Sequence, residues 1–151
     1  MRAFRIVKKR HMLTAFTGDG ARAYGGRWNF PGIPMVYAAH TRALAALESL
    51  VHFGGAERRM EFVTFELEIP DKLAIHLEAA KLPRDWRNPE PSPSTQALGS
   101  EWLRKGGSAV LVVPSVLVPQ ESCVLLNPEH PDIDRIMVSY PEVFSFDSRL
   151  G

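Results

Sequence analysis

The clearest hydrophobic pattern in the chain is an alternation typical of a half-buried β-strand. Val63, Phe65, Leu67 and Ile69 alternate with polar residues, and Pro70 ends the run. Shorter apolar runs predict further strands at 2–7, 35–38, 73–77, 109–113, 122–126, 135–138 and 143–146. Strands therefore outnumber helices in the predicted structure.

Helical periodicity predicts two helices. The first begins after Thr41, which can cap it, and runs to about Phe53, where two glycines follow. Its apolar stripe consists of Ala43, Leu44, Leu47, Leu50 and Val51. At about 100° per residue, Glu48 falls on the border of this stripe, where a carboxylate is partly desolvated. The second helix spans 95–105 and ends at a glycine pair.

The remaining segments read as connections within one domain. A glycine-bearing loop is predicted at 13–26 and a proline-rich loop at 88–94, whose flanks are each too short to form a separate domain. Several strands with only two helices indicate an α+β fold and not a doubly wound sheet. The 151 residues fit a single domain, 1–151, with one core.

Composition narrows the class of protein. Apolar residues make up 45% of the chain and charged residues 23%, as in ordinary globular proteins. The net charge of +1 and the lack of a basic tail argue against direct nucleic-acid binding through bulk charge, although a local basic cleft stays open. Cys123 stands alone, which indicates a reducing compartment. No apolar run approaches the ~20 residues that span a bilayer, so we expect a cytoplasmic protein without membrane contact.

Candidate chemistry concentrates between residues 24 and 48. Arg27 follows two glycines that let the backbone approach a ligand, and its planar guanidinium can bind phosphate or carboxylate bidentately. Tyr37, on a short apolar strand, is either a core aromatic or a flat stacking partner with a polar tip. Glu48 is either a solvated helix residue or a functional carboxylate. Each residue has an ordinary structural interpretation when taken alone.

The C-terminal half adds weaker signals. Ser115 is either a turn-former or a hydroxyl that holds a ligand phosphate, and Asn127 before a proline is an ordinary turn signal. The five histidines show no metal-binding spacing, so no metal site is predicted. The chain also lacks a phosphate-binding glycine loop and the nucleophile elbow of hydrolases.

The order of these motifs along the chain resembles that of the RES-domain proteins. The matching segments are 3–6, 25–28, 36–37, 45–52, 82–86, 95–102, 113–115, 126–131 and 146–150. They cover nearly the entire chain, and such an ordered series is far more specific than any one motif.

The resemblance implies a fold like that of the ADP-ribosyltransferases and a role as the toxin of a prokaryotic toxin–antitoxin pair. RES proteins deplete cellular NAD by cleaving its nicotinamide–ribose bond, through hydrolysis or phosphorolysis, and some members instead modify a protein with ADP-ribose. NAD is then a substrate, with phosphate as co-substrate in phosphorolysis, and no prosthetic group is expected. The partner is an antitoxin with an Xre-like helix-turn-helix domain that covers the active site in a hetero-oligomeric complex.

The resemblance also assigns the site. Family active-site positions match Arg27, Tyr37, Glu48 and Ser115, with Asn127 as a weaker match. In this scheme Glu48 stabilises the cation that develops on the ribose and orients the ribose hydroxyls. Arg27 holds a phosphate or the nicotinamide ribose, Tyr37 stacks on nicotinamide, and Ser115 bonds a phosphate oxygen. Nicotinamide leaves as a neutral molecule, so no strong general acid is required.

Two other functions stay open at this point. An ADP-ribosyltransferase would use the same cleft and differ only in the group that attacks the ribose. A catalytically idle interaction module of the same fold would show no NAD turnover when purified free of any partner.

Overall fold

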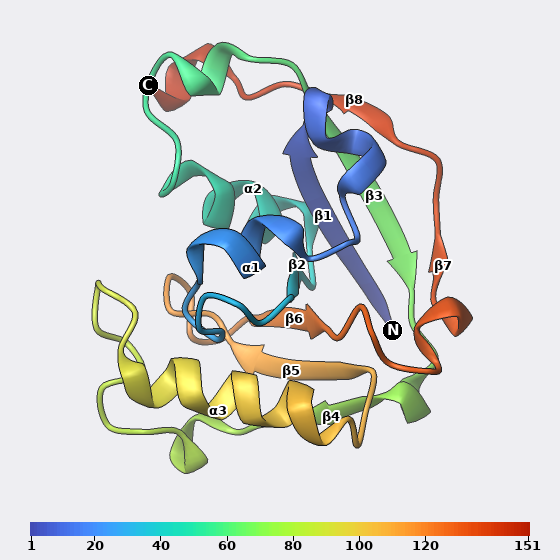
Figure 1. Ribbon diagram of the computed structural model, residues 1–151. Coiled ribbons are helices and arrows are strands. Elements are labelled where there is room, and N and C mark those ends of the chain that lie inside the picture. Colours follow the sequence, from blue (N-terminus) through green and yellow to red (C-terminus); the bar gives the residue numbers. More distant parts are fainter.

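Eight strands form one mixed sheet in the computed structural model, which describes residues 1–151 (Figure 1). The strands are β1 (Arg2–Lys8), β2 (Val36–Ala39), β3 (Phe62–Glu68), β4 (Ala74–His76), β5 (Val110–Pro114), β6 (Ser122–Leu126), β7 (Met137–Val138) and β8 (Glu142–Phe144). Three α-helices accompany them: α1 (Asp19–Tyr24), α2 (Arg42–Leu50) and α3 (Pro93–Lys105).

The strand order across the sheet is β4-β5-β6-β2-β1-β3-β7, and β8 also pairs with β3. Strands β4 and β5 run parallel, and every other pair is antiparallel. The longest pair, β1 and β3, is in register along its whole length, from Arg2 opposite Glu68 to Lys8 opposite Phe62. The predicted α+β class with a mixed sheet and few helices is confirmed.

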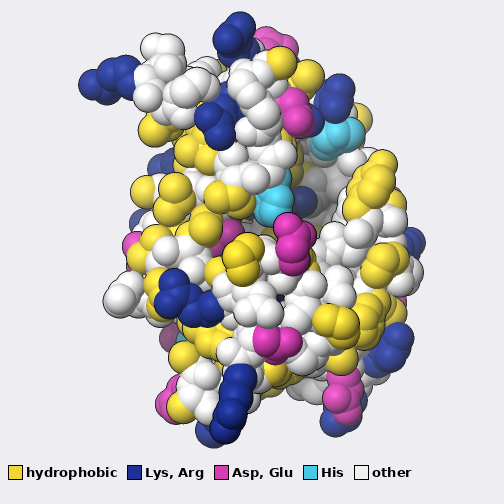
Figure 2. Space-filling view, turned by 90° about the vertical axis from the view of Figure 1, so that its left-hand side faces the viewer, with side chains coloured by type: hydrophobic (Ala, Val, Ile, Leu, Met, Phe, Trp, Pro, Cys, Tyr) yellow, Lys and Arg dark blue, Asp and Glu magenta, His cyan; other side chains and the backbone are white.

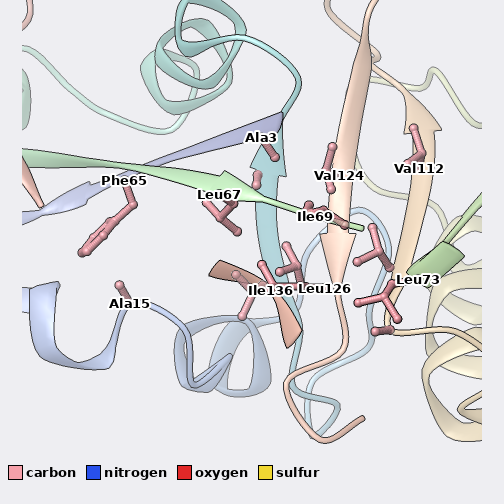
Figure 3. Close-up of a cluster of buried hydrophobic side chains, with 14 of the residues drawn as sticks. Ala3, Ala15, Phe65, Leu67, Ile69, Leu73, Val112, Val124, Leu126 and Ile136 are labelled. Atoms are coloured by element: carbon pink, nitrogen blue, oxygen red, sulfur yellow. The ribbon is translucent and has the colours of Figure 1, made fainter. Parts of the chain in front are cut away.

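One face of the sheet carries the larger hydrophobic core. Side chains of β1, β3, β5 and β6 point to this side, where Ala15 and Ile136 close the cluster (Figure 3). The alternating run predicted from the sequence is β3, whose Val63, Phe65 and Leu67 are all buried here. Successive side chains of a strand point to opposite faces, which is why the period of two places these three together.

Helices α2 and α3 cover different parts of the other face. Trp102 of α3 packs in a cluster with Leu111 of β5 and Leu125 of β6, and α3 runs along β5 (Figure 1). Leu44 of α2 packs in a second cluster with Ala39 of β2. Because β5 and β6 are buried on both faces, they read in the sequence as continuous apolar runs and not as alternating ones.

The first helix was not predicted, because 13–26 was expected to be a loop throughout. Helix α1 follows Gly18, whose φ of 76° is a left-handed conformation that glycine adopts at little steric cost. None of the residues of α1 is buried. A six-residue helix without a buried face has no apolar periodicity that could reveal it.

The ends of the other two helices agree with the sequence only approximately. The cap of α2 is confirmed, since the Thr41 hydroxyl accepts a hydrogen bond from the amide of Leu44 at 3.0 Å. Helix α2 ends at Leu50, before the expected end near Phe53. Helix α3 begins at Pro93, two residues early, because a proline in the first turn needs no amide partner. None of the helices is long and apolar enough to cross a membrane.

The predicted apolar stripe of α2 is wrong in orientation. Leu44 and Ala45 are buried, but Leu47 and Val51 are 40% and 56% exposed. The helix is therefore turned about its axis, and the residue one turn after Leu44, Glu48, shares the buried side in place of Leu47. A carboxylate can occupy that side only if the fold supplies donors for it.

Candidate active site

Glu48 accepts two hydrogen bonds from residues far away in the sequence. The Ser115 hydroxyl, just after β5, donates to its Oε1 at 2.7 Å, and the Cys123 thiol of β6 donates to the same atom at 3.3 Å. Both donors converge on one oxygen, and no hydrogen bond from the chain reaches Oε2. The carboxylate is therefore held in one orientation with an oxygen left for a ligand.

Ser115 is fully buried and uses its hydroxyl completely. Besides donating to Glu48, its Oγ accepts hydrogen bonds from the amides of Leu117 and Val118, both at 3.1 Å. These bonds tie the turn between β5 and β6 to the carboxylate of α2. The expectation that Ser115 meets a phosphate conflicts with this burial, and its geometry suits the positioning of Glu48.

Tyr37 of β2 has its hydroxyl fixed at both its donor and its acceptor side. It donates to Oδ1 of Asn29 at 2.6 Å and accepts from the amide of Trp28 at 3.1 Å. Asn29 is completely buried, and its amide nitrogen donates to the carbonyls of Ala21, Phe30 and Ile33. The phenol is thus part of the scaffold of the glycine loop, and only its ring is available for stacking.

The guanidinium of Arg27 donates hydrogen bonds to backbone carbonyls at the start of the proline-rich loop. Nη1 donates to the carbonyls of Trp86 at 3.1 Å and Asn88 at 2.8 Å, and Nη2 donates to the carbonyl of Pro89 at 3.0 Å. Three of the five N–H donors of a guanidinium are thereby used, which leaves Nε–H and one Nη2–H. Nε and Nη2 are neighbours on the guanidinium, and donors on such a pair can bind an oxyanion bidentately.

Helix α3 positions the loop segment 26–30, which carries Arg27. The Gln96 amide donates to the carbonyl of Gly26 at 3.1 Å, and the amide of Phe30 donates to the Ser100 hydroxyl at 3.0 Å. Between them Gly99 lies so close to this segment that a Cβ on it would stand 1.9 Å from the carbonyl oxygen of Trp28. The loop of Arg27 is therefore clamped against one helix face at three successive points.

The charges of the site influence one another across the cleft. Burial lowers the pKa of Arg27, and the nearby carboxylate of Glu48 acts in the opposite direction and raises it. Burial also raises the pKa of Tyr37 well above its ordinary value, so the phenol stays neutral at physiological pH. One guanidinium and one carboxylate are consequently the charged groups among the four candidate residues brought together here.

The surface is hollowed on the side of the molecule that lies to the left in Figure 1. Figure 2 shows this hollow with histidine, basic and acidic side chains gathered around it. Leu47 of α2 and Val51, the residue that caps its C-terminal end, are exposed apolar residues on either side of Glu48 in the sequence. The geometry thus places an oriented carboxylate, an aromatic ring and a guanidinium near one another.

Asn127 lies elsewhere, beyond the opposite end of β6 from Cys123. Its side chain donates to the carbonyl of Leu103 at 3.3 Å and accepts from the amide of Glu129 at 3.0 Å, as in an Asx turn. It lines a hollow of about 470 Å³ that contains none of the other candidate residues. The structure brings Arg27, Tyr37, Glu48 and Ser115 together and leaves Asn127 apart.

Two residues of the cluster, Asn29 and Cys123, received no role from the sequence. Asn29 is only two positions from Arg27, which is a weak signal, because a polar residue after a glycine pair is usually a solvated turn. Cys123 lies within an apolar run and has no motif around it. Cys123 meets Glu48 only through pairing of β2 with β6 and packing of α2 on the sheet. The partners of Asn29 are local, because Ala21, Phe30, Ile33 and Tyr37 all lie within eight residues of it.

The environment of Cys123 predicts an unreactive thiol. Burial raises its pKa strongly, and the carboxylate of Glu48 raises it further, so the thiolate is not populated at neutral pH. We expect negligible reaction of the native protein with a disulfide reagent such as DTNB at pH 8. The same protein in denaturant should release one equivalent of chromophore, since the chain has one cysteine. Rapid stoichiometric labelling of the native state would contradict the described packing.

Comparison with known proteins places the chain in a family. The RES domain model matches residues 2–147. The protein named Toxin Res of Yersinia enterocolitica is 40% identical over 151 residues, which cover 99% of each chain. The Prs ADP-ribosylating toxin of a Sphingobium species is 37% identical over 137 residues, covering 89% of this chain and 85% of that protein. The chain therefore belongs to the RES domain family of toxins, as the order of its motifs predicted.

A solved structure shares the fold. A chain of the M. tuberculosis MbcT–MbcA toxin–antitoxin complex superposes with a TM-score of 0.76, over 95% of this chain and 84% of that one. The two sequences are 16% identical, so this likeness concerns the fold alone.

Proposed function

We propose that this protein cleaves the nicotinamide–ribose bond of NAD and acts as the toxin of a toxin–antitoxin pair. The observation that carries the proposal is the carboxylate of Glu48, held by two donors on one oxygen within a cleft that also presents Arg27 and Tyr37. Family membership supports it, because relatives of nearly equal length are named as toxins.

The reaction needs stabilisation of a cation more than transfer of a proton. The C–N bond to the ribose breaks with both electrons moving to the nicotinamide, whose ring loses its positive charge and leaves as a neutral molecule. Positive charge then develops on the ribose, where the free oxygen of Glu48 can stabilise it in a cleft of low dielectric. Water or phosphate completes the reaction by forming a bond to the same ribose carbon and giving up a proton to the solvent.

The other residues bind and position the substrate in this proposal. The two unused donors of Arg27 take a phosphate oxygen pair, and the ring of Tyr37 supports the nicotinamide. Ser115 acts through Glu48, as does the thiol of Cys123. The resting charges suit such a ligand, because the carboxylate faces the cationic end of NAD and the guanidinium faces its phosphates.

An antitoxin that closes the cleft is part of the same proposal. An enzyme that consumes a central cofactor would harm its own cell unless the site were covered. Leu47 and Val51 support a docked partner, because they present exposed apolar surface on α2 and at its C-terminal end, next to Glu48. We propose a helix-turn-helix protein as that partner, and co-purification from the native operon would test it. Recovery of free, active toxin from that preparation would count heavily against the idea.

The decisive experiment is incubation of the purified, partner-free protein with NAD, with and without phosphate, followed by mass identification of the products. We expect nicotinamide together with ADP-ribose if water attacks, or with a phosphate ester of ADP-ribose if phosphate attacks. Intact NAD after prolonged incubation of folded protein would exclude the proposal and leave an interaction module of the same fold.

Transfer of ADP-ribose to a protein is a second candidate, favoured by the name of the Sphingobium relative. It uses the same cleavage step, and a nucleophilic side chain of the acceptor replaces water. Incubation with labelled NAD and cell lysate would reveal it as label on a discrete protein band. Release of free ADP-ribose in equal amounts with and without lysate would argue for hydrolysis.

A further inference from the structure

Arg87 is a cation of the connection 82–92, which leads into α3 and contains most of the proline-rich loop. Its backbone neighbours Trp86 and Asn88 supply carbonyls to Arg27. Its own Nη2 donates to the carbonyl of Val116 at 3.3 Å, one residue after the hydroxyl that holds Glu48. One short piece of chain thus links the guanidinium of Arg27 to the turn that positions the carboxylate.

The charge of Arg87 is oriented but not neutralised. Its guanidinium lies over the ring of Trp86, 5.9 Å from the centroid, and its one hydrogen bond goes to a neutral carbonyl. No ion pair of the molecule involves it. The side chain is exposed, so most of its N–H donors face solvent and can reach a ligand.

The positive charge near Arg27 is too small to balance the two negative charges of a dinucleotide's pyrophosphate. Glu48 and Arg27 cancel each other, whereas a pyrophosphate brings two negative charges. Glu90, an acidic residue of the same loop that raises the pKa of Arg27, adds further negative potential. A second cation beside Arg27 is therefore needed for favourable pyrophosphate binding, and Arg87 is the one that the loop places between Arg27 and the Ser115 turn.

We propose that Arg87 binds the adenylate-side phosphate of the substrate, while Arg27 binds the phosphate nearer the nicotinamide. This assignment rests on the proposed cleavage of NAD and names a specificity-determining residue for it. It makes the protein selective for a dinucleotide over nicotinamide mononucleotide, which lacks the adenylate-side phosphate. In this assignment Arg87 contributes to substrate binding, and Glu48 contributes to the chemical step.

The test compares Arg87→Gln with Arg84→Gln on both substrates. Arg84 lies three residues earlier in the same loop and is also exposed, so it is the matched control for loss of one charge. For Arg87→Gln we expect the KM for NAD to rise about tenfold or more, the size usual for a hydrogen bond to a charged group. We expect kcat to stay within about threefold, because an interaction present in both ground and transition states changes KM alone.

Measurements with nicotinamide mononucleotide distinguish loss of the phosphate contact of Arg87 from a general disturbance of the loop. Its KM, or its inhibition constant against NAD, should be the same in the wild-type protein, Arg87→Gln and Arg84→Gln. An unchanged KM for NAD in Arg87→Gln, or an equal loss for both compounds, would overturn the assignment. Failure of the wild-type protein to cleave NAD would instead reject the proposed function, so the two failures are distinguishable.

Discussion

Glu48→Gln should reduce NAD cleavage by ~10²-fold or more, the usual effect of removing one preorganised electrostatic group. The amide keeps the shape of the side chain, and its oxygen can still accept from Ser115 and Cys123. What it loses is the negative charge that stabilises the ribosyl cation. The measurement is initial rate of nicotinamide release, and the loss should appear in kcat and in kcat/KM alike.

The matched control for this variant is Glu101→Gln. Glu101 is an exposed residue of α3 that pairs with Lys105 one turn later, so the same chemical change occurs away from the cleft. Thermal unfolding should show both proteins folded, with Glu48→Gln shifted by about 1 kcal/mol or less, because its hydrogen bonds change from charged to neutral. A stably folded Glu48→Gln protein with full NAD cleavage would show that Glu48 is not the catalytic carboxylate.

Gly99→Ala should lower the free energy of unfolding by about 2 kcal/mol, within the range for overpacking a well-packed contact. The added Cβ would lie 1.9 Å from the carbonyl oxygen of Trp28, and a backbone atom cannot turn aside as a flexible side chain can. Helix α3 and the 26–30 segment must therefore separate. The hydrogen bond from Gln96 to Gly26 weakens with that movement, so Arg27 shifts and the KM for NAD should rise as well.

Gly20→Ala is the control, because it places the same substitution in a helix without the close contact. A Cβ on Gly20 would meet nothing within 4 Å. Alanine favours helical backbone over glycine by roughly 0.5–1 kcal/mol, so Gly20→Ala should unfold at an equal or higher denaturant concentration than wild type. Equal midpoints for Gly99→Ala and wild type would mean that α3 does not clamp the loop of Arg27 as described.

Local patterns were sufficient wherever the physical cause is local. The alternation that predicts β3 depends only on which side chains share a face, and the Thr41 cap depends only on a hydroxyl three residues before an amide. The order of short motifs along the chain likewise identified the family. Helix α1 escaped prediction because it buries none of its residues and so has no pattern to show.

The rotation of α2 shows where local patterns fail. Leu47 and Val51 have the more apolar side chains, so the sequence favours them for the buried side. The fold instead buries Leu44 and Ala45 and half-buries Glu48. A carboxylate is acceptable there because the neighbouring strand and turn donate hydrogen bonds to it. Those donors belong to the last third of the chain.

What the sequence determined by itself was the set of strands, the two longer helices, the family, and the residue types of the site. Only the tertiary structure decided how these residues work together. Ser115 is 67 positions from Glu48, and its hydroxyl becomes a donor for that carboxylate only when α2 packs beside β5 and β6. The partners of Arg27 are backbone carbonyls some 60 residues away. Every residue has such a carbonyl, so no side-chain pattern can reveal which of them will meet the guanidinium.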